Sequence, residues 1–231
     1  MNETTYEPAI TGLLVVDPYN DFISDGGKLW PQTKETAERV NCVPNMIEVL
    51  KAARAAGVRV FIAPHHRWRE GDSDHWKYFA PIQHFTRKLK VFALDTWGGE
   101  FHPAFQPKPG DIVAQEHWCS SGFANTDLDL QLKKHGIHKV IVIGQRANTC
   151  IDSTVRYAAE LGYEVTLIKD AIAAFSWDEM RTTLEQNAPN YATAILSTEE
   201  IIARLHPPKS VAPDVEPEEA ENHENYSLTS R

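Results

Sequence analysis

Cys150 is the residue whose type and surroundings best fit nucleophilic chemistry. It follows an apolar run at residues 140–143 that breaks at Gly144, and a helix-like stretch begins near Thr149. This order predicts a thiol at the start of a helix, just past the carboxyl end of a strand. The partial positive charge of a helix start stabilises a thiolate, so we expect Cys150 to be a nucleophile. The alternative is a small buried apolar side chain, as most free cysteines are.

Two further segments carry acid–base groups. Asp17 ends a short apolar strand at residues 13–16, and Glu116 and His117 follow a strand-like segment at residues 111–114. Because ligands of parallel α/β sheets bind at the carboxyl ends of the strands, we expect these groups and Cys150 to meet at one rim. Asp17 would then accept the thiol proton. An aspartate at a strand end can instead form a turn or a helix cap, but we expect no helix directly after it.

The elements that must position these groups alternate along the chain. The apolar patterns predict strands at residues 13–16, 58–63, 111–114, 139–143, 164–168 and 191–196. They predict helices at residues 43–56, 126–134, 149–161, from about 178, and 198–205. This alternation predicts an α/β fold with a doubly wound, mainly parallel six-stranded sheet and helices on both faces, which is Rossmann-like. The aromatic segment 67–109 has no regular pattern, and we expect a lid, a pocket wall or an oligomer contact there.

Composition limits the partners. The 231 residues, 42% of them hydrophobic, suit one domain at residues 11–206, with an N-terminal extension (1–10) and an acidic, Pro/Glu-rich tail (207–231) that we expect to be disordered. The net charge of -9 argues against nucleic acid and membrane partners. Three scattered cysteines do not make a disulfide framework, and we see no leader or membrane span. We therefore expect a cytoplasmic protein, and we predict no cofactor because no glycine-rich phosphate loop is present.

Three segments resemble a known family when they are taken together. They are residues 15–22 (VVDPYNDF), residues 144–151 (GQRANTCI) and residues 162–165 (GYEV). In this order and spacing they are similar to the isochorismatase-like cysteine hydrolase superfamily, over residues 11–196. The resemblance implies a small-molecule substrate and a homo-oligomer.

The resemblance also implies a mechanism. Asp17 takes the thiol proton, and the Cys150 thiolate attacks an amide, ureido or similar carbon. Backbone N–H groups near a cis peptide bond before the cysteine hold the oxyanion, and water releases the acyl group. The expected oxyanion donors are the amides of Cys150 and of Ala147 or a neighbour.

The chain departs from the family where a lysine is usual. Glu116 occupies that position by spacing, which predicts a carboxylate pair with Asp17 that shares a proton. His117 would supply positive charge if it points inward, although an outward-facing histidine is the other interpretation. Arg146 would bind a substrate carboxylate or lie at the surface.

Other residues are assigned to the pocket or tested as metal ligands. We expect Phe22 and Trp30 to line the substrate pocket. Nicotinamidase-like members of the family carry an Asp-x-His metal element, but here the corresponding residues are Pro64, His65 and His66. We therefore predict no metal site and interpret His65, His66 and His75 as pocket-wall or surface residues. The alternative is a metal site made by His66, with or without His75, and Asp72 or Asp74.

The function predicted from these features is hydrolysis of a C–N bond in a small amide or ureido compound through a cysteine thioester. The first alternative is isochorismatase-type cleavage of a vinyl ether with Asp17 as the acid, for which Cys150 is dispensable. The second alternative is a non-catalytic member whose site decayed when the lysine was lost.

Overall fold

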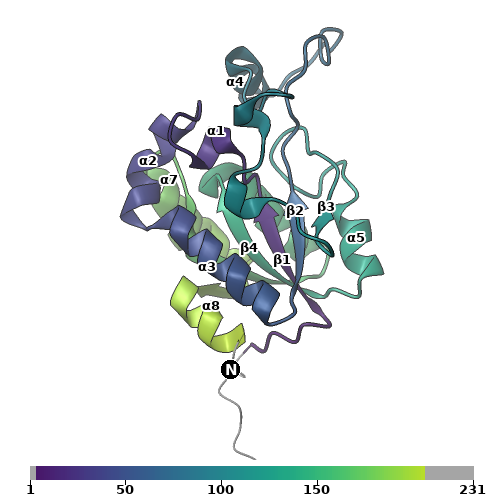
Figure 1. The fold of residues 1–231 in the computed structure, drawn as a ribbon, viewed down its shortest axis with the longest axis vertical. Coiled ribbons are helices and arrows are strands. Elements are labelled where there is room, and N and C mark those ends of the chain that lie inside the picture. Colours follow the sequence, from purple (N-terminus) through teal and green to yellow (C-terminus); the bar gives the residue numbers. More distant parts are fainter. Residues whose placement is uncertain (1–3, 206–231) are drawn as a thin grey trace, which may run out of the picture.

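In the computed structural model, residues 4–205 form a parallel sheet with helices on both faces (Figure 1). The six strands lie in the order β3-β2-β1-β4-β5-β6. Their bounds are β1 Thr11–Val16, β2 Arg59–Ala63, β3 Ile112–Val113, β4 Lys139–Gln145, β5 Glu164–Ala173 and β6 Ala194–Leu196. All the pairings between them are parallel. The predicted α/β fold class is therefore confirmed.

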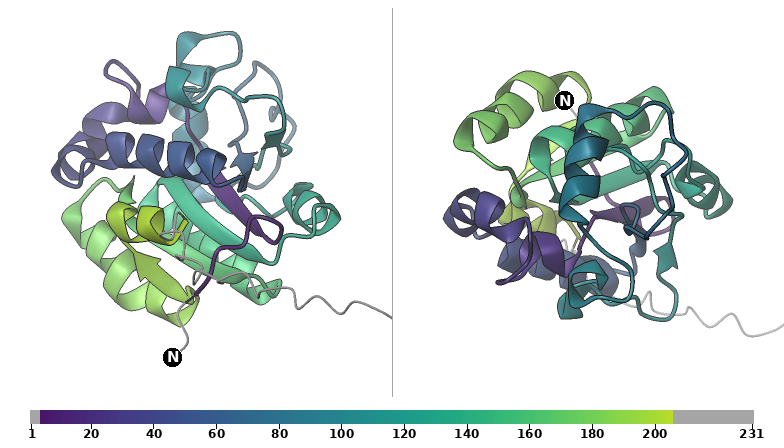
Figure 2. Two further views of the ribbon diagram at one scale, coloured as in Figure 1. Left: turned by 60° about the horizontal axis from the view of Figure 1, so that its bottom comes forward. Right: turned by 90° about the horizontal axis from the view of Figure 1, so that it is seen from above.

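The helices cover the two faces of this sheet (Figures 1 and 2). The α-helices are α1 Asn20–Ile23, α2 Trp30–Arg39, α3 Cys42–Ala55, α4 Pro81–Leu89, α5 Leu128–Lys134, α6 Asp152–Glu160, α7 Trp177–Arg181 and α8 Thr198–Leu205. Shorter helical turns are η1 Trp97–Gly99, η2 Pro103–Phe105, η3 Ala147–Ile151, η4 Thr182–Asn187 and η5 Ala188–Asn190. Of these, η3 and η4 have π-helical geometry.

Alternating strand residues build a separate core on each face of the sheet. In β1, Leu13 and Val15 join the core under α2, α3 and α8, whereas Leu14 and Val16 join the core under α5 and α6. This follows from the pleat, which points successive side chains to opposite faces. Every residue of β1 is buried, as expected for a central strand covered on both sides. The central strands are therefore held rigidly, and their carboxyl ends are fixed relative to one another.

Gly144 brings β4 into close contact with the backbone of β1. It pairs with Val16 in the parallel register and has a φ of 129°. A Cβ atom at this position would lie 2.1 Å from the carbonyl oxygen of Val16. Because real Cβ atoms do not approach a backbone oxygen so closely, glycine is required here by both space and conformation. This contact sets the spacing between the segment that carries Asp17 and the one that carries Cys150.

Several predicted boundaries were wrong. The structure has the short helix α1 just after Asp17, where we expected none, because a tight turn with a positive φ at Asp17 (53°) redirects the chain. The predicted helix at 149–161 divides into η3 and α6, and β5 continues to Ala173. The strand predicted at 111–114 is limited to Ile112–Val113, and the one at 191–196 begins at Ala194. The irregular segment 67–109 contains α4, η1 and η2.

The ends of the chain were assigned to an extension and a tail. Within the predicted extension, Tyr6 is 7% exposed and its hydroxyl forms a 2.9 Å hydrogen bond with the hydroxyl of Thr166 on β5. The predicted tail at 207–231 lies outside the described residues. None of the helices within residues 4–205 is long and apolar enough to cross a membrane.

Candidate active site

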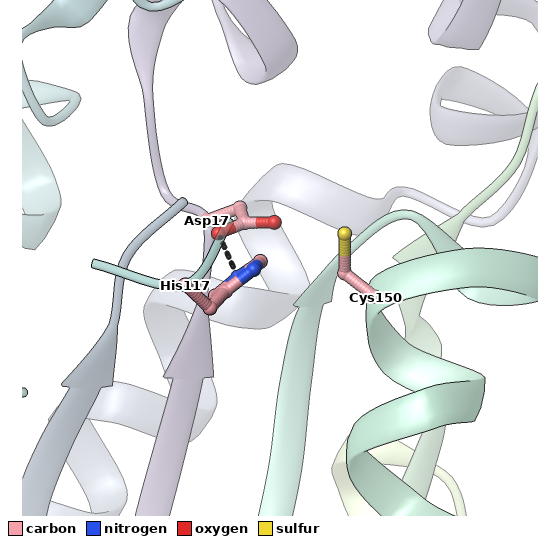
Figure 3. A group of neighbouring side chains, drawn as sticks. All are labelled: Asp17, His117 and Cys150. Atoms are coloured by element: carbon pink, nitrogen blue, oxygen red, sulfur yellow. Dashed lines mark hydrogen bonds and ion pairs between the residues drawn. The ribbon is translucent and has the colours of Figure 1, made fainter. Parts of the chain in front are cut away.

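Asp17, His117 and Cys150 converge at the carboxyl ends of the central strands. Asp17 directly follows β1, His117 forms a parallel bridge with His65 just beyond β2, and Cys150 lies in η3 beyond β4. The side-chain donor atoms of these three residues all lie within 4.8 Å of one another, and each residue is buried. Figure 3 shows one oxygen of Asp17 bonded to His117 while the other points toward the sulfur of Cys150.

The hydrogen bond between His117 and Asp17 fixes the roles of both groups. His117 Nε2 lies 3.0 Å from Asp17 Oδ1. Because a carboxylate oxygen accepts, Nε2 carries the proton. Asp17 Oδ2 and His117 Nδ1 are buried without a hydrogen-bond partner within the described part of the chain. One oxygen of Asp17 is therefore oriented by the imidazole, and the other is available on the side of Cys150.

The environment of Cys150 raises the pKa of its thiol well above the ordinary value. Burial is the largest cause, and the negative charge of Asp17 is the next. The backbone N–H of Arg146 and the hydroxyl of Thr149 act in the opposite direction but are outweighed. The expected stabilisation of a thiolate by a helix start was therefore wrong. Cys150 lies in the irregular turn η3, and desolvation beside a carboxylate disfavours a second negative charge.

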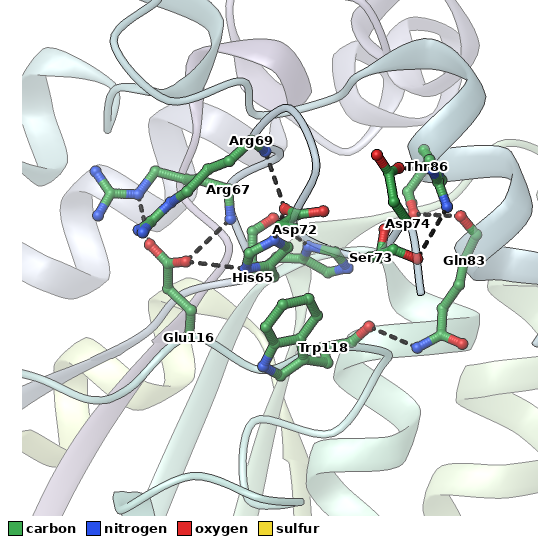
Figure 4. A network of polar contacts seen from close by, with 12 residues as sticks. His65, Arg67, Arg69, Asp72, Ser73, Asp74, Gln83, Thr86, Glu116 and Trp118 are labelled. Carbon is green, nitrogen blue, oxygen red and sulfur yellow. Dashed lines mark hydrogen bonds and ion pairs between the residues drawn. The ribbon is translucent and has the colours of Figure 1, made fainter. Parts of the chain in front are cut away.

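His117, and not Glu116, is the residue that contacts Asp17. The carboxylate of Glu116 instead accepts hydrogen bonds from Arg67, at 2.5 Å from Nε and 3.1 Å from the backbone nitrogen (Figure 4). It also lies 3.3 Å from His66 Nδ1. Burial opposes the ionisation of Glu116, but the hydrogen bonds from His66 and Arg67 lower its pKa to about 2. The predicted proton-sharing pair of Asp17 and Glu116 is therefore replaced by a Glu116–Arg67 ion pair. The interpretation of His117 as outward-facing was also wrong, because this side chain is fully buried.

A break in strand register explains why counting along the sequence selected the wrong residue. β2 and β3 pair Phe61 with Ile112 and Ile62 with Val113. Continuing that pairing without a break would set Glu116 opposite His65. The observed bridge joins His65 to His117, so the segment after β3 contains one extra residue. Such a bulge moves the following side chains to the other face of the sheet, and it turns His117 inward.

An apolar cavity opens beside Cys150. Of the residues predicted to bind substrate, Phe22 and Arg146 line it together with Cys150. Trp30 does not line it and packs against the hydrophobic core instead. Ala147 is fully buried in the other core. The peptide bond between Gln145 and Arg146 is cis, and the backbone N–H of Arg146 contacts the thiol of Cys150. The backbone amide beside the thiol is therefore that of Arg146 and not that of Ala147.

His65 is a cavity residue, which agrees with the interpretation of these histidines as part of a pocket wall. Its ring lies edge-on to that of His117, with centroids 5.0 Å apart, and it lines the cavity beside Cys150. Its Nδ1 lies 2.8 Å from the carbonyl oxygen of His66, so Nδ1 carries the proton. Burial and then the neighbouring His117 lower the pKa of His65 to about 4, which keeps it neutral. Its place directly after β2 was the one signal in the sequence.

The second set of histidines and acids does not converge on a common point. His66 Nε2 lies 2.6 Å from Asp72, whereas its Nδ1 faces Glu116, and Asp74 is paired with Arg87. Within residues 4–205, Asp17, His117 and Cys150 are the one group of His, Cys, Asp and Glu donors close enough together to hold a metal ion. His66 is stacked on Trp118, with centroids 3.7 Å apart. This second cluster therefore acts as a hydrogen-bonded wall next to the site.

Comparisons with known proteins identify the family of this chain. The family model described as "Isochorismatase domain" matches residues 11–200. The ureidoacrylate amidohydrolase RutB of Rhizobium rhizogenes is 30% identical over 178 residues, which cover 72% of each chain. An uncharacterized isochorismatase family protein of Bacillus subtilis is 32% identical over 163 residues, covering 71% of this chain and 77% of that protein. A crystal structure of a cysteine hydrolase from Pseudomonas syringae superposes with a TM-score of 0.71 at 26% identity, covering 89% of this chain and 99% of that one. The chain thus belongs to the isochorismatase family of hydrolases.

Proposed function

We propose that this protein is an amidohydrolase that cleaves a C–N bond of a small amide or ureido compound through a thioester on Cys150. The observation that carries the proposal is the convergence of a thiol, a carboxylate and an imidazole within 4.8 Å beside an apolar cavity. The similarity to a ureidoacrylate amidohydrolase supports the choice of reaction. The proposal includes no cofactor and no metal.

In the first half of the reaction, Asp17 takes the proton of the Cys150 thiol and the sulfur attacks the carbonyl carbon. The developing oxyanion accepts hydrogen bonds from the backbone N–H groups of Arg146 and Cys150. When the tetrahedral intermediate collapses, the C–N bond breaks and Asp17 returns the proton to the leaving nitrogen. The product is a thioester on Cys150 and a released amine or ammonia.

In the second half, Asp17 takes a proton from water, whose oxygen attacks the thioester carbon. Collapse of this intermediate releases the carboxylic acid and returns the proton to sulfur. His117 holds Asp17 through the 3.0 Å hydrogen bond, which keeps the second carboxylate oxygen directed at the thiol. His117 thus takes the position that the family's lysine occupies. Glu116 orients the chain around residues 116–117 through its hydrogen bonds with Arg67.

A panel of small amides and ureido compounds tests the proposal, with release of ammonia or amine as the readout and intact-mass spectrometry to detect the acyl-enzyme. We expect turnover that is abolished in Cys150→Ala and Asp17→Asn, and an acyl adduct on Cys150. Cys119→Ala is the matched control, because Cys119 lines the same cavity but has no assigned chemical role. Turnover of a vinyl ether that survives Cys150→Ala would show isochorismatase-type chemistry instead. A Cys150 no more reactive toward alkylation than Cys42 and Cys119 would indicate a non-catalytic protein.

A further inference from the structure

Arg146 places a guanidinium in the cavity beside the nucleophile. It follows β4 directly and contributes to the cavity wall together with Cys150. Its Nε lies 3.4 Å from the Thr149 hydroxyl, which in turn lies 3.9 Å from the sulfur of Cys150. The guanidinium also lies 3.9 Å from the centre of the Phe175 ring. The Phe175 ring therefore covers one face of the guanidinium, and the hydroxyl oxygen of Thr149 lies between the guanidinium and the thiol.

The charge of Arg146 is poorly compensated within the protein. Its side chain is 14% exposed, and the carboxylate paired with it, Glu179, lies 3.8 Å away, beyond hydrogen-bond distance. The same oxygen of Glu179 already accepts a 2.9 Å hydrogen bond from the backbone of Phe175. Burial lowers the pKa of Arg146, and Glu179 and Cys150 only partly offset this effect. A guanidinium has five N–H donors, and within residues 4–205 the one hydrogen bond that this guanidinium donates is the bond from Nε to Thr149.

Among the described residues, the rest of the cavity wall offers no competing charge. Arg146 is the one permanently charged side chain that residues 4–205 contribute to this wall, since His65 is neutral near pH 7. Most of the other lining side chains are apolar: Phe22, Leu29, Ile82, Phe85, Phe92 and Phe175. A cavity with one cation, an apolar wall and a nucleophile suits a ligand with an apolar body and one anionic group.

We infer that Arg146 binds a carboxylate of the substrate, so that the substrates are small amides or ureido compounds that carry a carboxylate. This inference rests on the proposed function and narrows it. A carboxylate matches the planar fork of the guanidinium and forms two charge-assisted hydrogen bonds with it. A neutral amide of the same size would leave the largely buried cation without a charged ligand, and such a cation discriminates against ligands that cannot pair with it.

Alkylation of Cys150 by iodoacetate and by iodoacetamide tests the inference, because the two reagents differ only in the anionic group. Each rate is measured by peptide mass spectrometry and divided by the rate for glutathione under the same conditions. We expect the normalised iodoacetate-to-iodoacetamide ratio to be about 10- to 100-fold higher for the protein than for Arg146→Gln, the range of a hydrogen bond to a charged group. Arg146→Lys keeps the charge and should retain part of this preference.

Arg181→Gln is the matched control, since Arg181 is an exposed arginine that pairs with Asp178 on α7. It should leave the ratio unchanged. A ratio that is the same in the unaltered protein, in Arg146→Gln and in glutathione would overturn the inference while leaving a reactive Cys150 and the proposed function intact. Failure of both reagents to alkylate Cys150 faster than Cys42 would overturn the proposed function as well. If Arg146→Gln does not fold, the normalised iodoacetate-to-iodoacetamide ratio of the unaltered protein still tests the inference, because a ratio equal to that of glutathione would overturn it.

Discussion

The neutral His65 in the cavity wall should make the stability of this protein fall as the solution becomes mildly acidic. His65 is 6% exposed, and burial lowers its pKa from 6.5 to about 4 in the folded protein. Between these two values the unfolded chain binds a proton that the folded protein does not. The contribution of His65 to stability is therefore complete above pH 6.5 and is lost as the pH falls toward 4.

The size of this effect follows from the shift. Since one pKa unit corresponds to about 1.4 kcal/mol, His65 alone should lower the free energy of unfolding by about 3 kcal/mol between pH 8 and pH 4. His65→Asn removes the titration, and its amide N–H can still donate to the carbonyl oxygen of His66. We expect the variant to lose about 3 kcal/mol less stability than the unaltered protein over this pH range.

Urea unfolding at a series of pH values and one protein concentration measures the effect. For each pH we take the difference in the free energy of unfolding between His65→Asn and the unaltered protein. The way this difference changes with pH is what tests the prediction, because the substitution itself adds an offset that does not depend on pH. His75→Asn is the matched control, since His75 is exposed, and its curve should run parallel to that of the unaltered protein. Parallel curves for His65→Asn would refute the assignment of His65 as a buried neutral imidazole.

Three further predictions concern the site and its support. His117→Ala should lower the rate of turnover or of acyl-enzyme formation about 100-fold, whereas the rate of His117→Lys should stay within about 10-fold of that of the unaltered protein. Equal losses in both variants would argue that His117 does not position Asp17. Glu116→Gln should cost about 1–2 kcal/mol in urea unfolding because Arg67 loses its charged partner, yet leave Cys150 alkylation nearly unchanged; a large loss of reactivity would return Glu116 to the catalytic group. Gly144→Ala should lower the free energy of unfolding by about 2–4 kcal/mol, and Gly162→Ala by ~1–2 kcal/mol. Both glycines have a positive φ, but only at Gly144 would a Cβ atom meet the backbone of Val16. Equal costs would show that the close contact is relieved elsewhere.

The parts of the structure that could be predicted from sequence are those governed by periodic burial. The mostly apolar runs at residues 13–16, 140–143 and 165–168 lie in β1, β4 and β5, and such runs are typical of central parallel strands, so the existence and order of these strands were readable. Asp17 could be placed because it directly follows β1, and Cys150 because it lies in the turn just beyond β4. The helices α2 and α4 were missed because their mean composition is polar: α2 buries only Thr33, Thr36 and Ala37, and α4 buries no residue fully. Such helices form on a surface that the rest of the fold supplies.

The third member of the site could not be read in the same way, because its position depends on a pairing irregularity. β3 is a short edge strand, and nothing in residues 111–117 marks where the extra residue enters. A slip of one position exchanges the inward and outward side chains, so Glu116 and His117 exchange roles without any change in composition. Arg67 also separates the two side chains, because it forms an ion pair with the carboxylate of Glu116 away from Asp17.

The charges at the site determine the resting state of the nucleophile. Burial and the charge of Asp17 both disfavour a thiolate, so the proton rests on sulfur. Transfer to Asp17 exchanges one buried anion for another, which adds no net charge to the site. The step therefore needs no low thiol pKa. It needs Asp17 Oδ2 to face the sulfur, and the hydrogen bond from His117 to Oδ1 provides that orientation. A histidine can do this as well as a lysine, since the required feature is a donor held at the end of β3, and the bulge before His117 is what brings such a donor to Asp17.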